Sequence, residues 1–108
     1  MQVKELKNSL VCEMYSGLLT RKQYDVMDMY YNLDYSLTEI AENIGVSRQG
    51  VLDILKRTEM KLNEYEQKLG LLNKYTVTLD SLKKIEQSAQ DNELILKEVK
   101  KIREAWED

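Results

Sequence analysis

The side chains best equipped for chemistry in this sequence are hydrogen-bond donors and cations. Ser47, Arg48 and Gln49 stand in succession at the start of a segment with helical apolar periodicity. Arginine can donate two hydrogen bonds to guanine, glutamine can pair with adenine, and a serine at a helix N-terminus can hold a phosphate. Double-stranded DNA is therefore the predicted partner. The same predicted surface includes Leu52, Asp53 and Lys56, with Arg21, Lys22, Arg57 and Lys61 as candidate contacts to the DNA backbone.

Other kinds of chemistry are poorly represented. The 108 residues include no His, which removes the commonest general base and metal ligand, and a single Cys, which excludes an internal disulfide and a multi-Cys zinc site. Nothing among the acidic residues resembles a calcium-binding loop. We therefore expect a protein that is not an enzyme and has no cofactor or bound metal. Cys12 is interpreted as a small packing residue.

The balance of acidic and basic residues disfavours DNA binding. The chain carries 16 basic and 19 acidic residues, a net charge of −3. Residues 36–62 hold four of each sign, where a DNA-binding module normally has a basic surplus. Asp53 would repel phosphates unless it accepts a hydrogen bond from cytosine. The alternative is that Arg48 and Gln49 are ordinary solvated surface residues.

Helix signals surround these residues. The absence of Pro and the presence of only four Gly favour a mostly helical chain. Thr20 with Gln23 and Ser36 with Glu39 each form the pattern of a capping box, and each predicts a helix start. Gly45 is predicted to end the second of these helices, since glycine readily adopts a left-handed conformation. Ser47 is predicted to cap a third helix that ends near Gly70.

The apolar pattern predicts how the second and third of these helices meet. Ala41, Gly45, Val51 and Ile54 follow the spacing A-x3-G-x5-V-x2-I, with further apolar residues at Ile40, Ile44 and Val46. A small residue at position 41 allows close helix crossing, and glycine at 45 permits the turn. The larger apolar side chains fill the wedge between helices held at a steep angle. The pattern predicts a helix-turn-helix.

An upstream helix is predicted from a second apolar stripe. Its members recur at spacings of three and four and should form one buried face, with the helix ending near Gly17: Val3, Leu6, Leu10, Met14 and Leu18. The tyrosines at positions 24, 30, 31 and 35 could stack on bases, as in single-strand binders. In a chain without Phe, packing in and around the core is the favoured interpretation.

Residues 71–108 form a predicted helical tail, separate from a helix-turn-helix domain over residues 1–70. The apolar spacing predicts one or two amphipathic helices, with a break near Gln90 to Asn92. The run 76–78 is β-branched and a weak helix former, which allows a kink or break there. The apolar stripe of the tail needs a partner surface, either the N-terminal helix or a second copy. A symmetric homodimer is favoured, because it is the commonest assembly and would present two recognition helices.

The central segment resembles two known families. SLTEIA (36–41) and GVSRQGV (45–51) resemble the promoter-recognition helix-turn-helix of bacterial sigma factors. A closer similarity is to the YlxM-like family of small helix-turn-helix proteins, over about Tyr15 to Leu72. Its hallmarks here are LLT-x-x-Q, the Tyr30–Tyr31 pair, SLTEIA, GVSRQGV, the KR-x-E of residues 56–59, and EYEQKLGLL. The tail matches only as a helical segment.

The resemblance carries functional expectations. It implies a cytoplasmic protein of Gram-positive bacteria and their relatives, linked to the signal recognition particle pathway through the neighbourhood of its gene. The sequence also lacks a run of about 20 apolar residues that could span a membrane, and its N-terminus does not resemble a signal peptide. The expected function is a DNA-binding regulator. The alternative is a protein- or RNA-associated accessory factor of the particle, with the helix-turn-helix as a scaffold.

Overall fold

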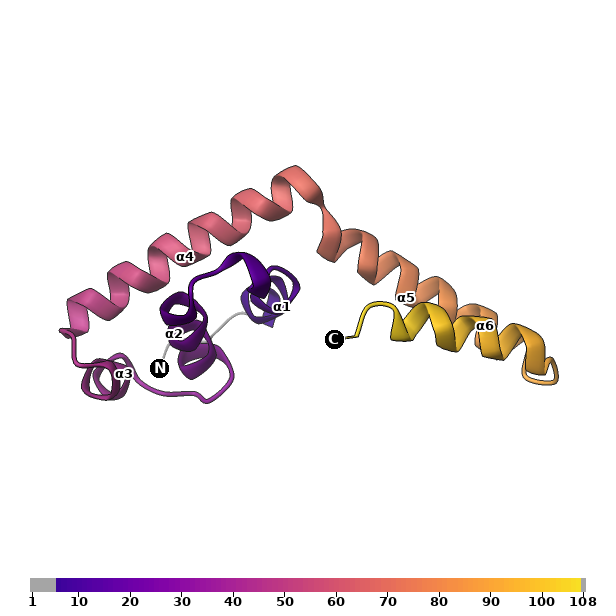
Figure 1. The fold of residues 1–108 in the computed structure, drawn as a ribbon, viewed down its shortest axis with the longest axis horizontal. Helices are drawn as coiled ribbons and strands as arrows, with labels where there is room; N and C mark the ends of the chain where they lie inside the picture. Colours follow the sequence, from indigo (N-terminus) through magenta and orange to yellow (C-terminus); the bar gives the residue numbers. More distant parts are fainter. Residues whose placement is uncertain (1–5, 108) are drawn as a thin grey trace. The chain divides into compact units, whose positions relative to one another are not determined.

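The computed structural model describes residues 6–107, and every regular element in that range is helical. The elements in order are α1 (Leu6–Met14), a 3-10 turn (Ser16–Leu18), α2 (Arg21–Tyr31), α3 (Leu37–Ile44), α4 (Arg48–Leu69), α5 (Leu71–Ser88) and α6 (Glu93–Glu104) (Figure 1). The predicted all-α fold is confirmed. The chain divides into two compact units, an N-terminal unit that reaches Leu72 and a C-terminal hairpin that begins at Asn73.

Helix α4 organises the N-terminal unit. Helices α1, α2 and α3 all contact it, and they lie along one side of it in Figure 1. One face of α4 is buried through Val51, Leu55, Thr58 and Leu62. Thr58 is accommodated there because its hydroxyl donates to the Ile54 carbonyl at 2.7 Å. The other buried apolar residues of this core are Val11, Cys12, Tyr15, Val26, Met27, Ile40 and Ala41.

The helix boundaries lie where the capping signals predicted them. Both capping boxes form, with reciprocal hydrogen bonds at Thr20 and at Ser36. Gly45 has φ 73° and ends α3, and Gly70 has φ 62° and ends α4. Residues with a Cβ rarely adopt this left-handed conformation, so both helices stop at the residue type best suited to stop them.

The stripe predicted for the first helix is wrong at two positions, although its member Met14 packs against the core. Leu10 is 47% exposed and Leu18 is 52% exposed, whereas Val11, Cys12 and Tyr15 form the buried face. The helix also ends at Met14 rather than near Gly17. The residues that follow tighten into a 3-10 turn, in which the Leu18 amide donates to the Tyr15 carbonyl at 2.9 Å. The predicted packing role of Cys12 is confirmed. Val3 and the side chain of Leu6 lie outside the described part of the chain.

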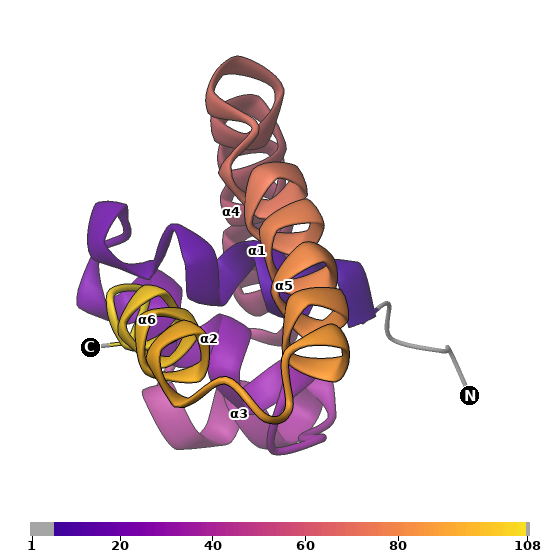
Figure 2. The ribbon, with the colours of Figure 1, turned by 90° about the vertical axis from the view of Figure 1, so that its right-hand side faces the viewer.

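The C-terminal hairpin consists of two antiparallel helices side by side (Figures 1 and 2). The predicted break is confirmed, because α5 ends at Ser88 and the Asn92 side chain caps α6 by accepting from the Ile95 amide at 3.1 Å. Leu82 and Val99 are each only 4% exposed. The helix does not break at residues 76–78, since α5 runs through this segment and the Thr78 hydroxyl donates to the Lys74 carbonyl.

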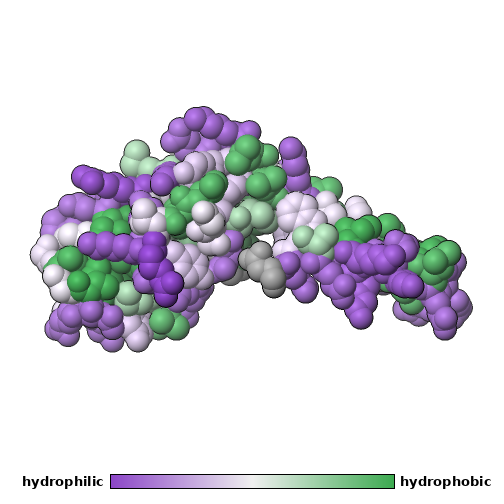
Figure 3. Space-filling view, viewed as in Figure 1, coloured by the Kyte–Doolittle hydropathy of each residue, from purple (hydrophilic) through white to green (hydrophobic). Residues whose placement is uncertain are grey.

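The hairpin satisfies part of its own apolar stripe. The rings of Tyr75 and Trp106 lie 5.1 Å apart between centroids, and Arg103 forms an ion pair with Glu86. Several large apolar side chains nevertheless stay exposed, and Figure 3 shows apolar patches among hydrophilic ones on this unit. They are Val77, Ile85, Leu94, Ile95, Ile102 and Trp106. Within residues 6–107, no helix is both long and apolar enough to cross a membrane.

Two substitutions test the helix crossing. Ala41 is 7% exposed between α3 and its neighbours, so Ala41→Leu should overpack the core and cost about 1–3 kcal/mol of unfolding free energy. Gly45→Val should cost a similar amount, about 1–3 kcal/mol, because it forces a β-branched residue to φ 73°. Denaturant unfolding measures both.

The matched controls are Glu42→Leu, at an exposed position beside Ala41, and Gly17→Val, where φ lies outside the left-handed region and a Cβ meets no other atom within 4 Å. Both controls should unfold close to wild type. Wild-type stability in Ala41→Leu and Gly45→Val would contradict the assigned packing of the helix-turn-helix.

Candidate nucleic-acid interface

The turn between α3 and α4 presents the first residues of α4 to solvent. The Gly45 amide donates to the Ala41 carbonyl at 3.0 Å, and the Val46 amide donates to the same oxygen at 3.1 Å, so the chain reverses tightly. The Ser47 side chain then caps α4 by accepting from the Gly50 amide at 2.9 Å. A Cβ at position 50 would lie 3.2 Å from the Ser47 hydroxyl, so glycine leaves room for this cap.

Most of the predicted contact residues of α4, among them Gln49, Asp53 and Lys56, lie on its outer face. Arg48 lies in line with the buried stripe, three residues before Val51, and is exposed in the first turn of the helix. With about 100° between successive residues, the buried face and the outer face are opposite each other. The exposed members of the predicted set are Ser47, Arg48, Gln49, Asp53, Lys56 and Arg57. Leu52 is half-buried at the edge of this face. The first three turns of α4 therefore bring together polar groups that can donate or accept hydrogen bonds outside the core.

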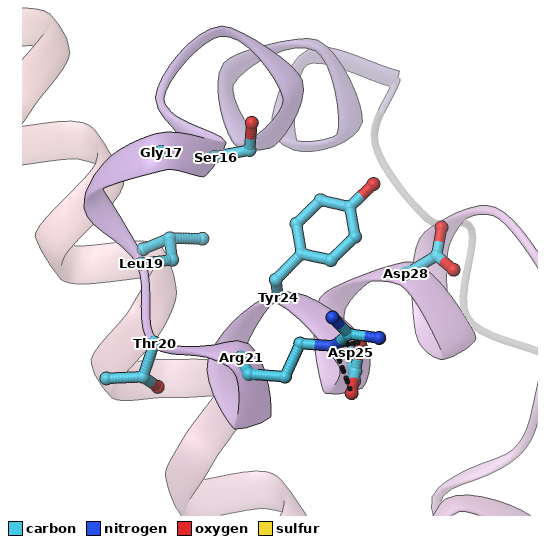
Figure 4. Close-up of a pocket in the computed structure, with 8 residues that line it drawn as sticks. All are labelled: Ser16, Gly17, Leu19, Thr20, Arg21, Tyr24, Asp25 and Asp28. Carbon is cyan, nitrogen blue, oxygen red and sulfur yellow. Dashed lines mark hydrogen bonds and ion pairs between the residues drawn. The ribbon is translucent and has the colours of Figure 1, made fainter.

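The candidate backbone contacts differ in their surroundings. Arg21 forms an ion pair with Asp25, with Nε 3.3 Å from a carboxylate oxygen (Figure 4). Lys61 is half-buried, and its Nζ lies 5.9 Å from the centroid of the Tyr65 ring. Lys22, Lys56 and Arg57 are exposed. These three cations would reach a phosphate at the least cost in lost protein contacts.

A shallow hollow beside α2 is a separate feature. It is lined by Ser16, Gly17, Leu19, Thr20, Arg21, Tyr24, Asp25 and Asp28, and its volume is about 650 Å³ (Figure 4). The Tyr24 hydroxyl donates to Glu13 at 3.0 Å, and this bond raises the pKa of Tyr24 to about 12. The carboxylates make the hollow a poor place for phosphate. Among residues 6–107, no His, Cys, Asp and Glu side chains gather in a group that could hold a metal ion.

Tyrosine–carboxylate hydrogen bonds, which the sequence pattern does not predict, hold α4 in place. The Tyr31 hydroxyl on α2 donates to Glu59 on α4 and accepts from the Asn8 side chain of α1 at 3.1 Å. Burial, and then the bond to Glu59, raise the pKa of Tyr31 well above its usual value. Tyr24, Tyr30, Tyr31 and Tyr35 all pack against the core, as predicted. No spacing rule identifies such pairs, because their members are far apart in the sequence.

Tyr15 forms a second junction of this kind. Its hydroxyl donates to Glu66 at 2.6 Å and accepts from the Leu71 amide at 3.1 Å, while Glu66 accepts from the Leu72 amide at 3.0 Å. The two side chains thereby satisfy amide groups of the first turn of α5, which has no intrahelical partner for them. Burial raises the pKa of Tyr15, and burial raises that of the Cys12 thiol to about 11. Cys12 is thus a protonated packing residue at neutral pH.

Comparison with known proteins places this geometry in a family. Residues 2–102 match the model of the family described as "Putative helix-turn-helix protein, YlxM / p13 like". The chain belongs to this family. The match extends into α6 of the C-terminal hairpin, beyond the segment in which the sequence motifs are recognisable.

Curated relatives in the family are similar over most of their length. A UPF0122 protein of Bacillus cereus is 42% identical over 104 residues, which covers 96% of this chain and 94% of the relative. The UPF0122 protein of Bacillus anthracis gives the same values. A relative from Caldanaerobacter subterraneus subsp. tengcongensis is 47% identical over 79 residues, covering 73% of this chain and 68% of its own. The family supports a helix-turn-helix binding protein.

The Tyr31 junction can be tested by removing one oxygen atom. Tyr31→Phe should destabilise the N-terminal unit by about 1–3 kcal/mol, because Glu59 and Asn8 lose a partly buried partner. Tyr24→Phe is the matched control, since its bond to Glu13 is exposed and its loss should cost less. Urea unfolding of both variants gives the comparison. An equal or larger cost at Tyr24 would contradict the role assigned to Tyr31.

Proposed function

We propose that this protein is a non-enzymatic, cytoplasmic DNA-binding regulator linked to the signal recognition particle pathway. The observation that carries the proposal is the exposed first turn of α4, where Arg48 and Gln49 follow the Ser47 cap. In helix-turn-helix proteins this turn leads the recognition helix into the major groove. Arg48 would read guanine, and Gln49 would read adenine. The pathway link comes from the family resemblance.

The cations around the recognition helix set the expected strength of binding. Six basic residues are candidates to face a duplex: Arg21, Lys22, Arg48, Lys56, Arg57 and Lys61. Arg21 and Lys61 have partners within the protein, and Arg48 is assigned to a base, so about three phosphate contacts per subunit remain. Counterion release then gives a slope of log K against log salt of about −3 per subunit. Binding by one subunit is accordingly modest, and a second recognition helix would strengthen it.

The C-terminal hairpin is proposed to pair two copies of the chain and so to bring in the second recognition helix. Ile85, Ile102 and Trp106 are each 43% exposed, and Leu94 is 70% exposed. Exposed apolar side chains on an amphipathic hairpin favour association, since their burial is stabilising by about 25 cal/mol for each Å² removed from water. A symmetric pairing of two hairpins would cover these residues and join two DNA-binding units.

A second candidate function is an accessory factor that binds a protein or RNA of the signal recognition particle. The observation in its favour is the equal number of acidic and basic residues over positions 36–62. Exposed carboxylates of α3 add to it, because Glu39 and Glu42 line a shallow hollow together with Tyr35 and Asn43. On this alternative the helix-turn-helix serves as a scaffold, and duplex binding stays near background at physiological salt.

Duplex binding measured by fluorescence anisotropy over a range of salt tests the leading proposal. Arg48→Ala and Gln49→Ala should reduce the preference between sequences by about 1–3 kcal/mol each. Lys56→Ala should weaken binding to all duplexes and flatten the salt slope by about one unit. Lys68→Ala is the matched control, because Lys68 lies in the last turn of α4 and pairs with Glu64 at 2.9 Å.

The opposing result is equally specific. A selection from genomic fragments would then yield no preferred sequence, while the protein captures the GTPase or the RNA of the signal recognition particle. If this capture also persists after Arg48→Ala, the accessory-factor function replaces the DNA-binding one.

Association through the hairpin is checked by light scattering. The full chain should give about twice its 12.7 kDa mass at micromolar concentration. Ile85→Glu combined with Ile102→Glu should give the monomer mass, because two charges would be buried without partners in the pairing. Gln87→Glu, at an exposed polar position on α5, should leave the mass doubled. A monomeric wild-type chain would refute a dimerising hairpin.

A further inference from the structure

We propose that Asp53 is a positioning residue that orients the Gln49 side chain to read adenine and to reject guanine. The inference rests on the proposed DNA binding and names the base contact within it. The observation that supports it is a hydrogen bond on the exposed face of the first turns of α4, in which Gln49 Nε2 donates to Asp53 Oδ1 at 3.1 Å. The two residues are four positions apart, so one helical turn brings their side chains together.

The carboxylate determines which way the carboxamide of Gln49 faces. An ionised aspartate only accepts hydrogen bonds, whereas a glutamine amide has a donor side and an acceptor side. The opposite orientation would place the Gln49 carbonyl oxygen against a negatively charged oxygen. Asp53 therefore holds the Nε2 side toward itself and removes the ambiguity between the two orientations of the amide.

What remains available on Gln49 matches one base edge in the major groove. One N–H of Nε2 is donated to Asp53, which leaves the second N–H and the oxygen Oε1 for a ligand. Adenine offers the acceptor N7 beside the donor N6, a complementary pair. Guanine offers two acceptors, N7 and O6, and a carboxamide with only one remaining N–H cannot satisfy both. The pairing of Gln49 with Asp53 thus excludes guanine as well as favouring adenine.

Neighbouring cations reduce the repulsion between the Asp53 carboxylate and the phosphates of DNA. The exposed cations Lys56 and Arg57 lie three and four residues farther along the same helix, on the adjacent turn. They offset the negative charge where the DNA backbone would pass. One carboxylate oxygen of Asp53 accepts from Gln49. Asp53 therefore acts on the base through Gln49 and need not lie beside a phosphate.

The test is a set of duplexes that differ at single base pairs, built on the best site from a randomised selection and bound to the full-length chain. Wild type should prefer adenine over guanine at one position, and Gln49→Ala should abolish that preference. Asp53→Ala should reduce the adenine-to-guanine ratio by about fivefold to tenfold, because the carboxamide of Gln49 regains its second N–H and can turn toward guanine. Its overall affinity should be unchanged or higher, since a negative charge is removed.

Three controls make the result specific. In the Gln49→Ala background, Asp53→Ala should cause no further change in base preference at that position. Glu64→Ala removes an exposed carboxylate elsewhere on α4 and should leave the base preference intact. Both Asp53 and Gln49 are exposed, so the single variants should melt with wild type, as circular dichroism would verify.

Each other outcome overturns the inference in a distinguishable way. An unchanged adenine-to-guanine ratio in Asp53→Ala shows that Gln49 needs no orienting partner. A preference for cytosine that depends on Asp53 but not on Gln49 shows that Asp53 reads a base itself. The absence of any sequence preference in wild type defeats the proposed DNA-binding function together with the inference.

Discussion

The buried face of α4 is the constraint on which the N-terminal unit depends. Val51, Leu55 and Leu62 contact a core to which α1, α2 and α3 all contribute. A helix of 22 residues can serve three neighbours because its apolar residues recur along one side. The opposite side is thereby left to solvent, and its first turns carry the polar residues proposed to meet DNA. The same apolar periodicity thus packs one face of α4 into the core and exposes the polar residues of the opposite face.

Tyrosine takes the place of phenylalanine in the core of this chain, and its hydroxyl adds hydrogen bonds of defined geometry to the packing. The chain has seven Tyr and no Phe. Tyr15 buries its ring and Tyr31 partly buries its own. They donate to Glu66 and Glu59 on α4, so each contact joins apolar burial to a hydrogen bond. A ring alone could slide along a helix surface. A ring whose hydroxyl must meet one carboxylate specifies both the rotation and the axial position of α4.

The balance of charge over the proposed DNA-binding surface has a local explanation. Over residues 36–62 the charges cancel, yet they are not mixed at random. Glu59 is engaged by Tyr31, and Asp53 by Gln49, whereas Lys56 and Arg57 lie exposed beside them. Counting charges along the sequence treats all of these groups as equivalent. Their hydrogen bonds show that part of the acidic charge serves the core or a neighbouring side chain.

The sequence by itself determined what depends on neighbouring residues: the caps at Thr20, Ser36 and Ser47, and the left-handed stops at Gly45 and Gly70. These interactions span three or four positions, so spacing reveals them. Only the tertiary structure decided which face of α1 is buried, that Tyr15 and Tyr31 reach α4, and that residues 76–78 stay helical. In α1 two apolar faces compete, and the choice depends on contacts with distant residues. One such contact joins Tyr15, directly after α1, to Glu66, 51 positions away. Local periodicity has no means of representing such a contact.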